Sequence, residues 1–314
     1  MSGSRVVAFG HHQPERVLTN ADLEKMVDTN DEWIRQRTGI ATRRIAAEKE
    51  TVADMASAAG AKALAASGLA PSDIGQVIVA TCSAIDRSPS TAARVAAHLS
   101  IPSAVVFDLN NACAGFCTAL ATADHTIRAG AAQHALVIGA EKMSDLVDWT
   151  DRSSCILLGD GAGAAVVSAS PDALISPVTW GSDPTRSDAV RLVDQWQPRF
   201  SQEGQAVFRW ATSELPAIAI QACERAGVAV TDLAAVVTHQ ANLRIIEAMT
   251  RKLGLREGTV IARDVVESGN TSAASVPLAL SKMAESGDLP SGQPVLLFAF
   301  GGGLSWAGQV ITAP

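Results

Sequence analysis

The residue whose type and position most directly indicate chemistry is Cys113. It lies in Asp-Leu-Asn-Asn-Ala-Cys-Ala-Gly-Phe (108–116), after the apolar run 104–107 and at the opening of a helix-like segment that continues to about Ala129. A helix start offers unpaired backbone N–H groups and the positive end of the helix dipole, which favour a thiolate and can lower a cysteine pKa from about 8.5. This position predicts a nucleophile. The alternative is a small buried residue of a core helix, because free cysteines are among the most buried residue types.

Two polar partners for such a nucleophile come from the second half of the chain. His239 opens His-Gln-Ala-Asn, and Asn270 lies in Gly-Asn-Thr-Ser-Ala-Ala-Ser (269–275). A cysteine and a histidine alone are also compatible with a hydrolase dyad. An asparagine partner, with no carboxylate to orient the histidine, favours a site that stabilises negative charge with neutral donors. The glycines 301–303 supply either a tight turn or a backbone N–H aimed at an oxyanion.

Three pairs of segments repeat along the chain at nearly one spacing. Chance hardly produces three such matches, so we predict two related α/β halves, residues 1–170 and 171–314. The pairs are 63–79 with 222–238 (offset 159), 135–140 with 294–299 (offset 159), and 108–130 with 264–287 (offset 156 to 157).

Each half alternates short apolar strands with alanine-rich helical segments, which is typical of an α/β fold. A half cannot easily cover both faces of its sheet alone. We therefore predict a layered stack in which the two related helices, beginning at Cys113 and near Asn270, are buried between two sheets. In the third pair of segments Asn270 is the counterpart of Cys113, and both are expected near a pseudo-twofold axis, with His239 on the loop after a strand. The predicted strands are 6–9, 77–80, 104–107, 136–138, 164–167, 236–238 and 295–298.

Composition and charge argue against several classes of function. The 314 residues carry a formal net charge of −7 and no basic tail, which is unlike a nucleic-acid-binding protein. No apolar run reaches the roughly 18 residues of a membrane span, and the first residues lack the pattern of a signal peptide, so a cytoplasmic protein without a membrane segment is predicted. The five cysteines form no Cys-x-x-Cys pair and have no histidine cluster at metal-ligand spacing. Neither disulfides nor a metal site is predicted.

A basic cluster, defined here as Arg244, Arg251 and Lys252, follows His239 along the chain. The two arginines are seven residues apart and project from one side of a predicted helix. Such a cluster is usually a solvated surface, but on an acidic protein it is also a candidate site for an acidic partner or a phosphate. The apolar positions that share the other face of the helix are Ile245, Ile246, Met249 and Leu253.

Together these features resemble the β-ketoacyl-acyl carrier protein synthase III family of the thiolase superfamily, over nearly the whole chain. The resemblance implies a thiolase-like α-β-α-β-α fold of two pseudo-duplicated halves. The chain is shorter than the elongating ketosynthases, which use two histidines, and it lacks the Glu-Cys-His pattern of hydroxymethylglutaryl-CoA synthase. The motifs that carry the resemblance are Asp31-Glu32-Trp33-Ile34, Arg37-Thr38-Gly39-Ile40, the Cys-Ala-Gly-Phe at 113–116, Asp151-Arg152, Gly159-Asp160-Gly161, Glu203-Gly204, Val207-Phe208, the His-Gln-Ala-Asn at 239–242, the 269–275 segment and the Gly-Gly-Gly-Leu-Ser-Trp at 301–306.

The resemblance implies a two-stage acyl transfer at the start of fatty acid or polyketide synthesis. Cys113 attacks an acyl-CoA thioester and holds the acyl group, while the backbone N–H groups of Cys113 and Gly303 stabilise the oxyanion. Malonyl-acyl carrier protein then binds, and His239 and Asn270 donate hydrogen bonds to its thioester carbonyl. Loss of carbon dioxide gives an enolate that attacks the acyl group. A homodimer is implied, and no metal or cofactor is implied beyond acyl-CoA as substrate.

Further roles follow from the same resemblance. Trp33 and Arg152 are expected to sandwich the adenine of coenzyme A, because both side chains stack on aromatic rings, and Arg37 is expected near the phosphates. The basic cluster is expected to dock the acidic acyl carrier protein. The residues expected along the pantetheine arm are Gly204, Phe208 and Asn242.

The chain departs from the family near the acyl pocket. The small Ser88, just before Pro89, stands where the family has a residue that shapes this pocket, and a wider or differently polar pocket is expected. Asn110-Asn111-Ala112 precedes Cys113 where a serine and small residues are expected. The identity of the acyl group, and the choice between fatty acid and polyketide synthesis, are therefore open.

Two other functions are compatible with the same residues. In one, Cys113 passes its acyl group to a carrier or hydroxyl acceptor without forming a carbon–carbon bond, as a priming acyltransferase. In the other, the fold is a non-catalytic scaffold or acyl-binding protein. Release of carbon dioxide separates condensation from the first alternative, and acylation of Cys113 separates both enzymes from the second.

Overall fold

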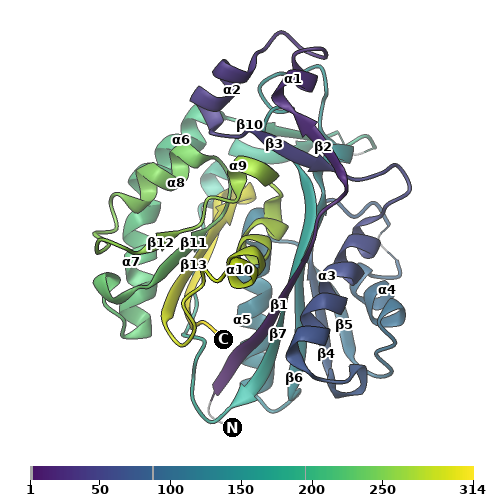
Figure 1. Cartoon of the computed structure of the whole chain (residues 1–314), viewed down its shortest axis with the longest axis vertical. Coiled ribbons are helices and arrows are strands. Elements are labelled where there is room, and N and C mark those ends of the chain that lie inside the picture. The colour runs from purple at the N-terminus through teal and green to yellow at the C-terminus, as the bar shows by residue number, and fades with distance from the viewer. Residues whose placement is uncertain (1–2, 87, 195) are drawn as a thin grey trace.

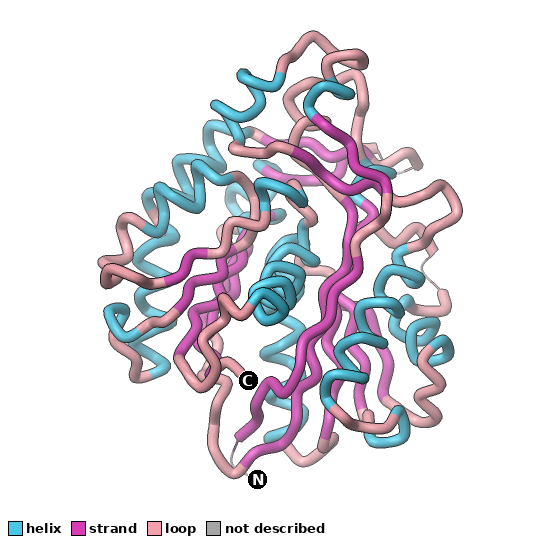
Figure 2. The backbone as a smooth tube through the Cα atoms, in the orientation of Figure 1, coloured by secondary structure: helices cyan, strands magenta, loops and turns pink. Residues whose placement is uncertain are grey.

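The computed structural model describes residues 3–86, 88–194 and 196–314. Two five-stranded sheets form its frame, and two helices lie between them (Figures 1 and 2). The first sheet takes all its strands from residues 3–170 and the second from 179–312. Further helices cover the outer face of each sheet. The predicted α-β-α-β-α stack is confirmed.

The first sheet has the strand order β1-β7-β6-β4-β5. The strands β6, β4 and β5 run parallel, and β7 is antiparallel to both of its neighbours. Most of these residues are buried, which explains why the strands read as short apolar runs. The bounds are β1 (Gly3–His12), β4 (Gln76–Ala80), β5 (Val105–Leu109), β6 (His134–Lys142) and β7 (Asp160–Ser170).

The second sheet repeats this arrangement, in the order β8-β14-β13-β11-β12. Again the last three strands are parallel and β14 is antiparallel to its neighbours. Every strand predicted from the sequence lies in one of the two sheets. The bounds are β8 (Thr179–Ser182), β11 (Ala235–Thr238), β12 (Val260–Ile261), β13 (Pro294–Gly301) and β14 (Ser305–Thr312).

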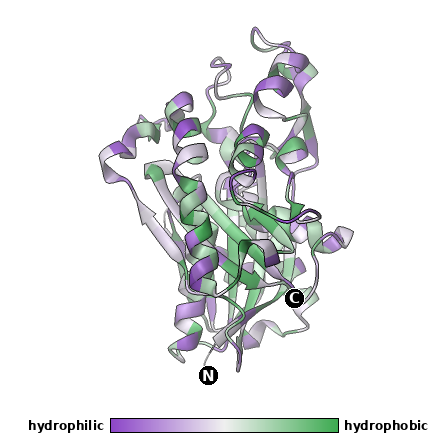
Figure 3. Ribbon diagram, turned by 90° about the vertical axis from the view of Figure 1, so that its left-hand side faces the viewer, coloured by the Kyte–Doolittle hydropathy of each residue, from purple (hydrophilic) through white to green (hydrophobic). Residues whose placement is uncertain are grey.

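Two helices, α5 (Gly115–Arg128) and α10 (Ser275–Ser286), occupy the middle layer. Glycines on the first sheet let α10 and the turn that opens it approach closely. A Cβ atom on Gly139 of β6 would lie 2.3 Å from the carbonyl oxygen of Ala273, and one on Gly163 of β7 would lie 2.3 Å from the backbone nitrogen of Leu278. Figure 3 shows the resulting hydrophobic interior, with hydrophilic residues on the outer helices.

Four helices cover the outer faces of the sheets. Packed on the first sheet, α3 begins with a capping box in which Thr51 and Asp54 bond each other's backbone, and it ends at Gly68, whose φ is +72°. Glycine fits that left-handed cap at no steric cost. The bounds of these helices are α3 (Val52–Ser67), α4 (Thr91–His98), α7 (Leu215–Ala226) and α8 (Leu243–Thr250).

Short elements cover one end of the stack, and several of them line the cavities described below. Among them is the antiparallel pair β2 and β3, which Figure 1 shows above β1. A second antiparallel pair, β9 and β10, was not predicted from sequence patterns; it lies along the chain between the strands of the two sheets. The bounds are β2 (Arg16–Thr19), α1 (Asn20–Leu23), α2 (Asp31–Thr38), β3 (Thr42–Ile45), β9 (Val190–Val193), β10 (Arg199–Gln202), α6 (Gly204–Ser213) and α9 (Val265–Ser268).

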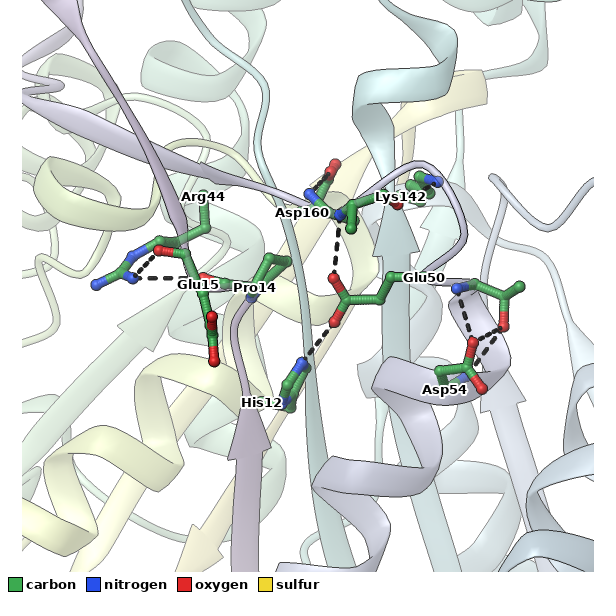
Figure 4. Close-up of polar contacts among 11 residues, drawn as sticks. His12, Pro14, Glu15, Arg44, Glu50, Asp54, Lys142 and Asp160 are labelled. Carbon is green, nitrogen blue, oxygen red and sulfur yellow. Dashed lines mark hydrogen bonds and ion pairs between the residues drawn. The ribbon is translucent and has the colours of Figure 1, made fainter.

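The loop between β3 and α3 is fixed by polar contacts (Figure 4). Glu50 contacts Nε2 of His12 on β1 at 2.8 Å and accepts a hydrogen bond from the Ala47 N–H at 3.2 Å. Lys142, at the end of β6, donates from Nζ to the carbonyl oxygens of Ala47 and Glu48, both at 3.1 Å. These two hydrogen bonds hold the Lys142 ammonium against this loop.

The turns that open α5 and α10 are true counterparts, but at an offset of 160. Each is a single 3₁₀ turn, at Ala112–Ala114 and Ser272–Ala274, and each starts with a left-handed residue, φ 43° at Ala112 and φ 48° at Ser272. The counterpart of Asn270 is therefore Asn110, and the sequence-based pairing of Asn270 with Cys113 is wrong. The error arises because α5 has 14 residues and α10 has 12, so an alignment that includes their ends shifts the register.

Candidate active site

The structure brings Cys113, His239 and Asn270 to one cavity of about 530 Å³. A second cavity of about 390 Å³ also includes Cys113 and Asn270 in its lining. The nucleophile candidate therefore lies where two cavities meet. One cavity extends past Trp33 and α6. The other is lined by Met143 and by apolar residues of β9 and β10, and also by the polar Asn110, Asn111 and Arg191.

Cys113 lies in the 3₁₀ turn ahead of α5 and is 8% exposed. Burial raises the pKa of its thiol to about 11, and the nearby Glu141 carboxylate acts in the same direction. The expectation of a lowered pKa at the helix start is therefore wrong. The sequence reveals the start of a helix, but not that desolvation of the sulfur outweighs the backbone donors around it.

The conformation of this turn depends on Gly301, the last residue of β13, and on Gly302, which follows it. Ala112 is in the left-handed region, which costs a non-glycine residue roughly 1–2 kcal/mol. A Cβ on Gly301 would lie 2.7 Å from Cβ and 2.8 Å from Sγ of Cys113, and one on Gly302 would lie 2.8 Å from Cβ of Ala112. The end of β13 can approach the nucleophile this closely only because it has no side chains.

His239 follows β11 and is 2% exposed. Its backbone N–H donates to the carbonyl oxygen of Phe298 at 2.8 Å, and the edge of its ring meets the Phe300 ring at a centroid distance of 5.4 Å. Nδ1 lies 2.8 Å from Oγ of Ser275, the first residue of α10. Burial lowers the pKa of the imidazole to about 3, so it is neutral at pH 7. With Nδ1 engaged by Ser275, Nε2 is the ring nitrogen left for a ligand.

Asn270 is held by backbone hydrogen bonds on both sides. Its N–H donates to the carbonyl oxygen of Leu157 at 2.8 Å, and its carbonyl oxygen accepts from the Gly159 N–H at 3.0 Å. The side-chain oxygen Oδ1 accepts from the Ser272 N–H at 2.9 Å. This bond identifies the oxygen of the carboxamide and leaves the Nδ2 donor for the cavity.

The glycine turn after β13 lies beside the nucleophile. The backbone N–H groups of Gly302 and of Cys113 itself act to lower the pKa of the Cys113 thiol, against the larger effect of burial. Gly303 lies in the wall of the smaller cavity, has a φ of +69°, and has no atom within 4 Å of a Cβ placed on it. The role of Gly303 as an oxyanion donor stays a prediction.

Aromatic and basic side chains gather along the larger cavity. The guanidinium groups of Arg37 and Arg152 each lie 5.0 Å from the centre of the Trp33 ring. Arg152 is also fixed by the carbonyl oxygen of Asp28, to which it donates at 2.9 Å. Trp33 and Arg37 line the cavity, whereas Arg152 reaches the site through its stacking on Trp33.

Gly204, Phe208 and Asn242 all line this larger cavity. A Cβ on Gly204 would meet no atom within 4 Å, so this wall is open. Asn242 has a structural role as well, because it caps α8 by accepting from the Arg244 N–H at 2.9 Å and donates to the Arg37 carbonyl oxygen at 3.2 Å. The guanidinium of Arg244 lies 5.5 Å from the centre of the Phe208 ring.

The basic cluster is exposed along α8 and just after it, while the apolar positions of the helix are buried as predicted. Arg244 is in the wall of the larger cavity, and Lys252 donates from Nζ to the Thr212 carbonyl oxygen at 2.7 Å. Ser88 is exposed and lines neither cavity, so its role at the acyl pocket stays a prediction. Its neighbour Arg87 lies outside the described residues.

Sequence reasoning missed several polar residues around the site. Ser275, which contacts His239, and Ser272, which contacts Asn270, belong to the 269–275 segment that the sequence did single out, and their spacing from the asparagine could have indicated them. Glu141 gives no comparable signal, because it is a lone carboxylate at the end of an apolar run. It is fully buried close to Cys113.

The described residues offer neither a metal-binding cluster nor a membrane-spanning helix. Within residues 3–86, 88–194 and 196–314, no group of three or more His, Cys, Asp or Glu side chains is arranged to hold a metal ion. In the same part of the chain, no helix combines the length and the apolar character that a membrane crossing requires.

Comparison with known proteins identifies the family. Residues 107–184 match the family 3-oxoacyl-[acyl-carrier-protein (ACP)] synthase III, and residues 223–313 match its C-terminal region. A β-ketoacyl-[acyl-carrier-protein] synthase III of Streptomyces coelicolor is 62% identical over 315 residues, covering 99% of both chains. The chain belongs to the 3-oxoacyl-ACP synthase III family. Its function is that of a β-ketoacyl-ACP synthase III, a condensing transferase.

Solved structures agree with this assignment. The priming β-ketosynthase of the R1128 polyketide pathway has a TM-score of 0.97 at 41% identity, covering 99% of this chain and 96% of that one. The 3-oxoacyl-ACP synthase III of Aquifex aeolicus has a TM-score of 0.94 at 40% identity, covering 99% and 100%. The thiolase-like fold implied by the sequence motifs is thereby confirmed.

Proposed function

We propose that this acyltransferase of the 3-oxoacyl-ACP synthase III type condenses an acyl-CoA starter with malonyl-acyl carrier protein through an acyl-Cys113 intermediate. One observation carries the proposal: the sulfur lies at the junction of two cavities, one of which it shares with a neutral histidine and an asparagine. The smaller cavity suits the acyl chain. The larger one suits the pantetheine arm that delivers first one thioester and then the other.

In the first half-reaction the Cys113 sulfur bonds to the thioester carbonyl carbon. The tetrahedral oxyanion accepts from the backbone N–H groups of Cys113 and Gly303, which both line the smaller cavity. The bond to the coenzyme A sulfur then breaks, and that sulfur leaves with the proton that the Cys113 thiol loses.

In the second half-reaction malonyl-acyl carrier protein occupies the larger cavity. Its thioester oxygen accepts from Nδ2 of Asn270 and from Nε2 of His239. Ser275 supports this tautomer, because its oxygen already accepts from the Gln240 N–H at 3.3 Å and its own proton is free for Nδ1. The bond to the carboxylate breaks, carbon dioxide leaves, and the enolate attacks the acyl carbonyl carbon. The Cys113 sulfur departs and regains a proton.

The coenzyme A contacts belong to the same proposal. Trp33 and Arg152 already form a stacked pair, into which an adenine ring inserts when the guanidinium moves outward. Arg37 supplies positive charge for the phosphates. The pantetheine arm passes the open wall at Gly204 and the side chains of Phe208 and Asn242.

Surface charge supports acyl carrier protein as a partner, and an exposed strand edge supports a second copy of the chain. The basic cluster lies beside the mouth of the larger cavity and suits the acidic surface of acyl carrier protein. Among the described residues, no strand pairs with the outer side of the edge strand β5, which exposes 62% of Val105. This edge suits pairing with a second copy in a homodimer. The reaction as written balances without a metal or other cofactor. That expectation and the cytoplasmic location remain predictions.

The proposal is tested with malonyl-acyl carrier protein labelled in its free carboxylate. Incubation with the enzyme and a set of acyl-CoA thioesters of increasing length and branching should release labelled carbon dioxide and yield a 3-oxoacyl carrier protein. Mass spectrometry should find the acyl group on Cys113 before the malonyl substrate is added. A product that retains the label contradicts condensation and supports the acyl-transfer alternative, whereas an unmodified Cys113 contradicts the whole scheme.

A further inference from the structure

A buried arginine lies behind the walls of the two cavities. Arg43, on β3, is fully buried and lines neither cavity. Its Nη2 donates to the carbonyl oxygen of Ile156 at 2.6 Å, and its Nη1 donates to Oδ1 of Asn20 at 2.8 Å. Both acceptors are neutral, and within the described residues Nε has no hydrogen-bond partner and no carboxylate pairs with the guanidinium. Because a charge buried without a counterion is costly, these hydrogen bonds must offset a large penalty.

The segment that Arg43 holds, residues 156–159, contributes to both cavities. Ile156 and Leu157 line the larger cavity, and Leu158 lines the smaller one. The chain passes through turns over residues 152–157, and β7 begins only at Asp160. A segment outside a helix or a sheet ladder depends on side chains to fix its position. The hydrogen bond from Arg43 to Ile156 does this from the side of β3.

Asn270 is anchored on the same segment. Its N–H donates to the carbonyl oxygen of Leu157 at 2.8 Å, and its carbonyl oxygen accepts from the Gly159 N–H at 3.0 Å. The stem of Arg43 packs where these two strands of backbone meet, because a Cβ placed on Gly159 or on Gly269 would lie 3.1 Å from Cβ of Arg43. A displacement of the segment 156–159 would therefore displace Asn270.

The strand that carries Arg43 also contacts the residues that precede Asn270. The N–H of Ala41, just before β3, donates to the carbonyl oxygen of Val266 at 2.7 Å. The hydroxyl of Thr42 donates to the carbonyl oxygen of Glu267 at 2.8 Å. Both acceptors belong to α9, which packs against β3 (Figure 1). The region around β3 thus holds both segments that meet at the asparagine.

We propose that Arg43 is a positioning residue for decarboxylation: by holding the segment 156–159 against β3, it fixes the place from which the Asn270 carboxamide meets the malonyl thioester. The hydrogen bond from the Ser272 N–H orients this carboxamide only relative to its own turn. The inference deepens the proposed function and rests on it for the role of Asn270. Burial lowers the pKa of the Arg43 guanidinium to about 10, so it remains charged at pH 7.

The test compares Arg43→Met with the wild type in the two half-reactions. Methionine keeps an apolar stem and removes the donors, so the Ile156 carbonyl loses its partner. Release of labelled carbon dioxide from saturating malonyl-acyl carrier protein should fall about 10- to 100-fold, because a small misplacement of a reacting group has a large effect on rate. Acylation of Cys113 by saturating acyl-CoA should stay within about threefold. Equal loss in both half-reactions, or no loss in either, overturns the proposal.

A double variant shows whether Arg43 acts through Asn270. In an Asn270→Ala background the carboxamide is already absent, so Arg43→Met should lower decarboxylation by less than a further factor of about two. Fully additive losses mean that Arg43 acts by another route, which overturns this proposal alone. Normal decarboxylation in Asn270→Ala by itself overturns both this proposal and the role of Asn270 in the proposed function, so the two failures are distinguishable.

Lys142→Met is the matched control. Like Arg43, Lys142 is a buried cation that donates to backbone carbonyl oxygens, but its loop, at 47–48, leads into α3 on the outer face of the first sheet (Figure 4). This variant should change the ratio of the two half-reaction rates by less than about twofold. A selective loss of decarboxylation as large as that in Arg43→Met would assign the effect to general loosening and overturn the proposal.

Arg43→Lys keeps the proposal testable even if Arg43→Met does not fold. Lysine retains the charge but lacks the planar fork that reaches Asn20 and Ile156 together, so decarboxylation should fall about three- to tenfold while acylation is unchanged. A crystal structure of the folded variant, determined without substrate, should show the Asn270 carboxamide displaced by about 0.5 Å or more, the tolerance of a reacting group. An undisplaced carboxamide overturns the proposal whatever the rates.

Discussion

The turns that open α5 and α10 have similar backbone conformations but present different chemical groups. Each follows a strand or an extended segment, places one residue in the left-handed region and continues as a helix buried between the two sheets. The first turn carries a sulfur atom, and the second carries hydrogen-bond donors. The duplicated fold thus provides two similar turns beside the same cavities, and in the proposed mechanism one forms the covalent bond while the residue just before the other stabilises negative charge.

The largest effect is expected when the nucleophile of the first turn is replaced. Cys113→Ser should lower acyl-enzyme formation by on the order of 10⁴-fold or more, because an unactivated hydroxyl is a far weaker nucleophile than a thiolate. Intact-mass spectrometry after incubation with acyl-CoA measures this directly. A serine variant that acylates within tenfold of the wild type would remove the sulfur from its central role.

The next effect concerns the ionisation of the same sulfur. With a thiol pKa of about 11, the thiolate fraction rises about tenfold per pH unit, so the alkylation rate of Cys113 should rise about 10³-fold between pH 7 and pH 10. His239, with a pKa of about 3, adds no inflection in this range. A plateau reached by pH 8 would mean that the helix start does lower the pKa, as the sequence alone suggested.

A smaller effect is expected when the glycine strand is moved away from the first turn. Gly301→Ala should lower the acylation rate by about 10²-fold, because the new methyl group would overlap the Cys113 side chain and displace it by a large fraction of an ångström or more. Acylation rates and thermal unfolding should be measured together. A normal acylation rate in the folded variant would contradict the close approach of β13 to the nucleophile.

The smallest effect lies outside the two turns, on the basic cluster. Arg251→Glu should raise the KM for malonyl-acyl carrier protein about tenfold, with little change in self-acylation by acyl-CoA, because reversal of a surface charge acts on docking. Arg5→Glu, at the exposed start of β1, is the matched control and should change neither constant. Equal effects of the two variants would show that only net charge matters.

The sequence predicted the parts of the site that are encoded in local patterns. The repeat and the apolar runs indicated the layers, and the motifs around Cys113, His239 and Asn270 indicated their convergence. Two predictions failed for physical reasons: burial of the Cys113 sulfur depends on residues distant in sequence, and the true offset between the turns was hidden by the unequal lengths of α5 and α10. Glu141 was missed because its partners lie about 60 and 130 residues away.

The division of labour between the two turns is tested most directly with Asn270→Ala. Acylation of Cys113 and release of labelled carbon dioxide are followed in the same sample. The account predicts that loss of one oxyanion donor lowers decarboxylation by about 10²–10³-fold, while acylation stays within about threefold of the wild type. Equal loss of both half-reactions would contradict the assignment of Asn270 to the second step alone.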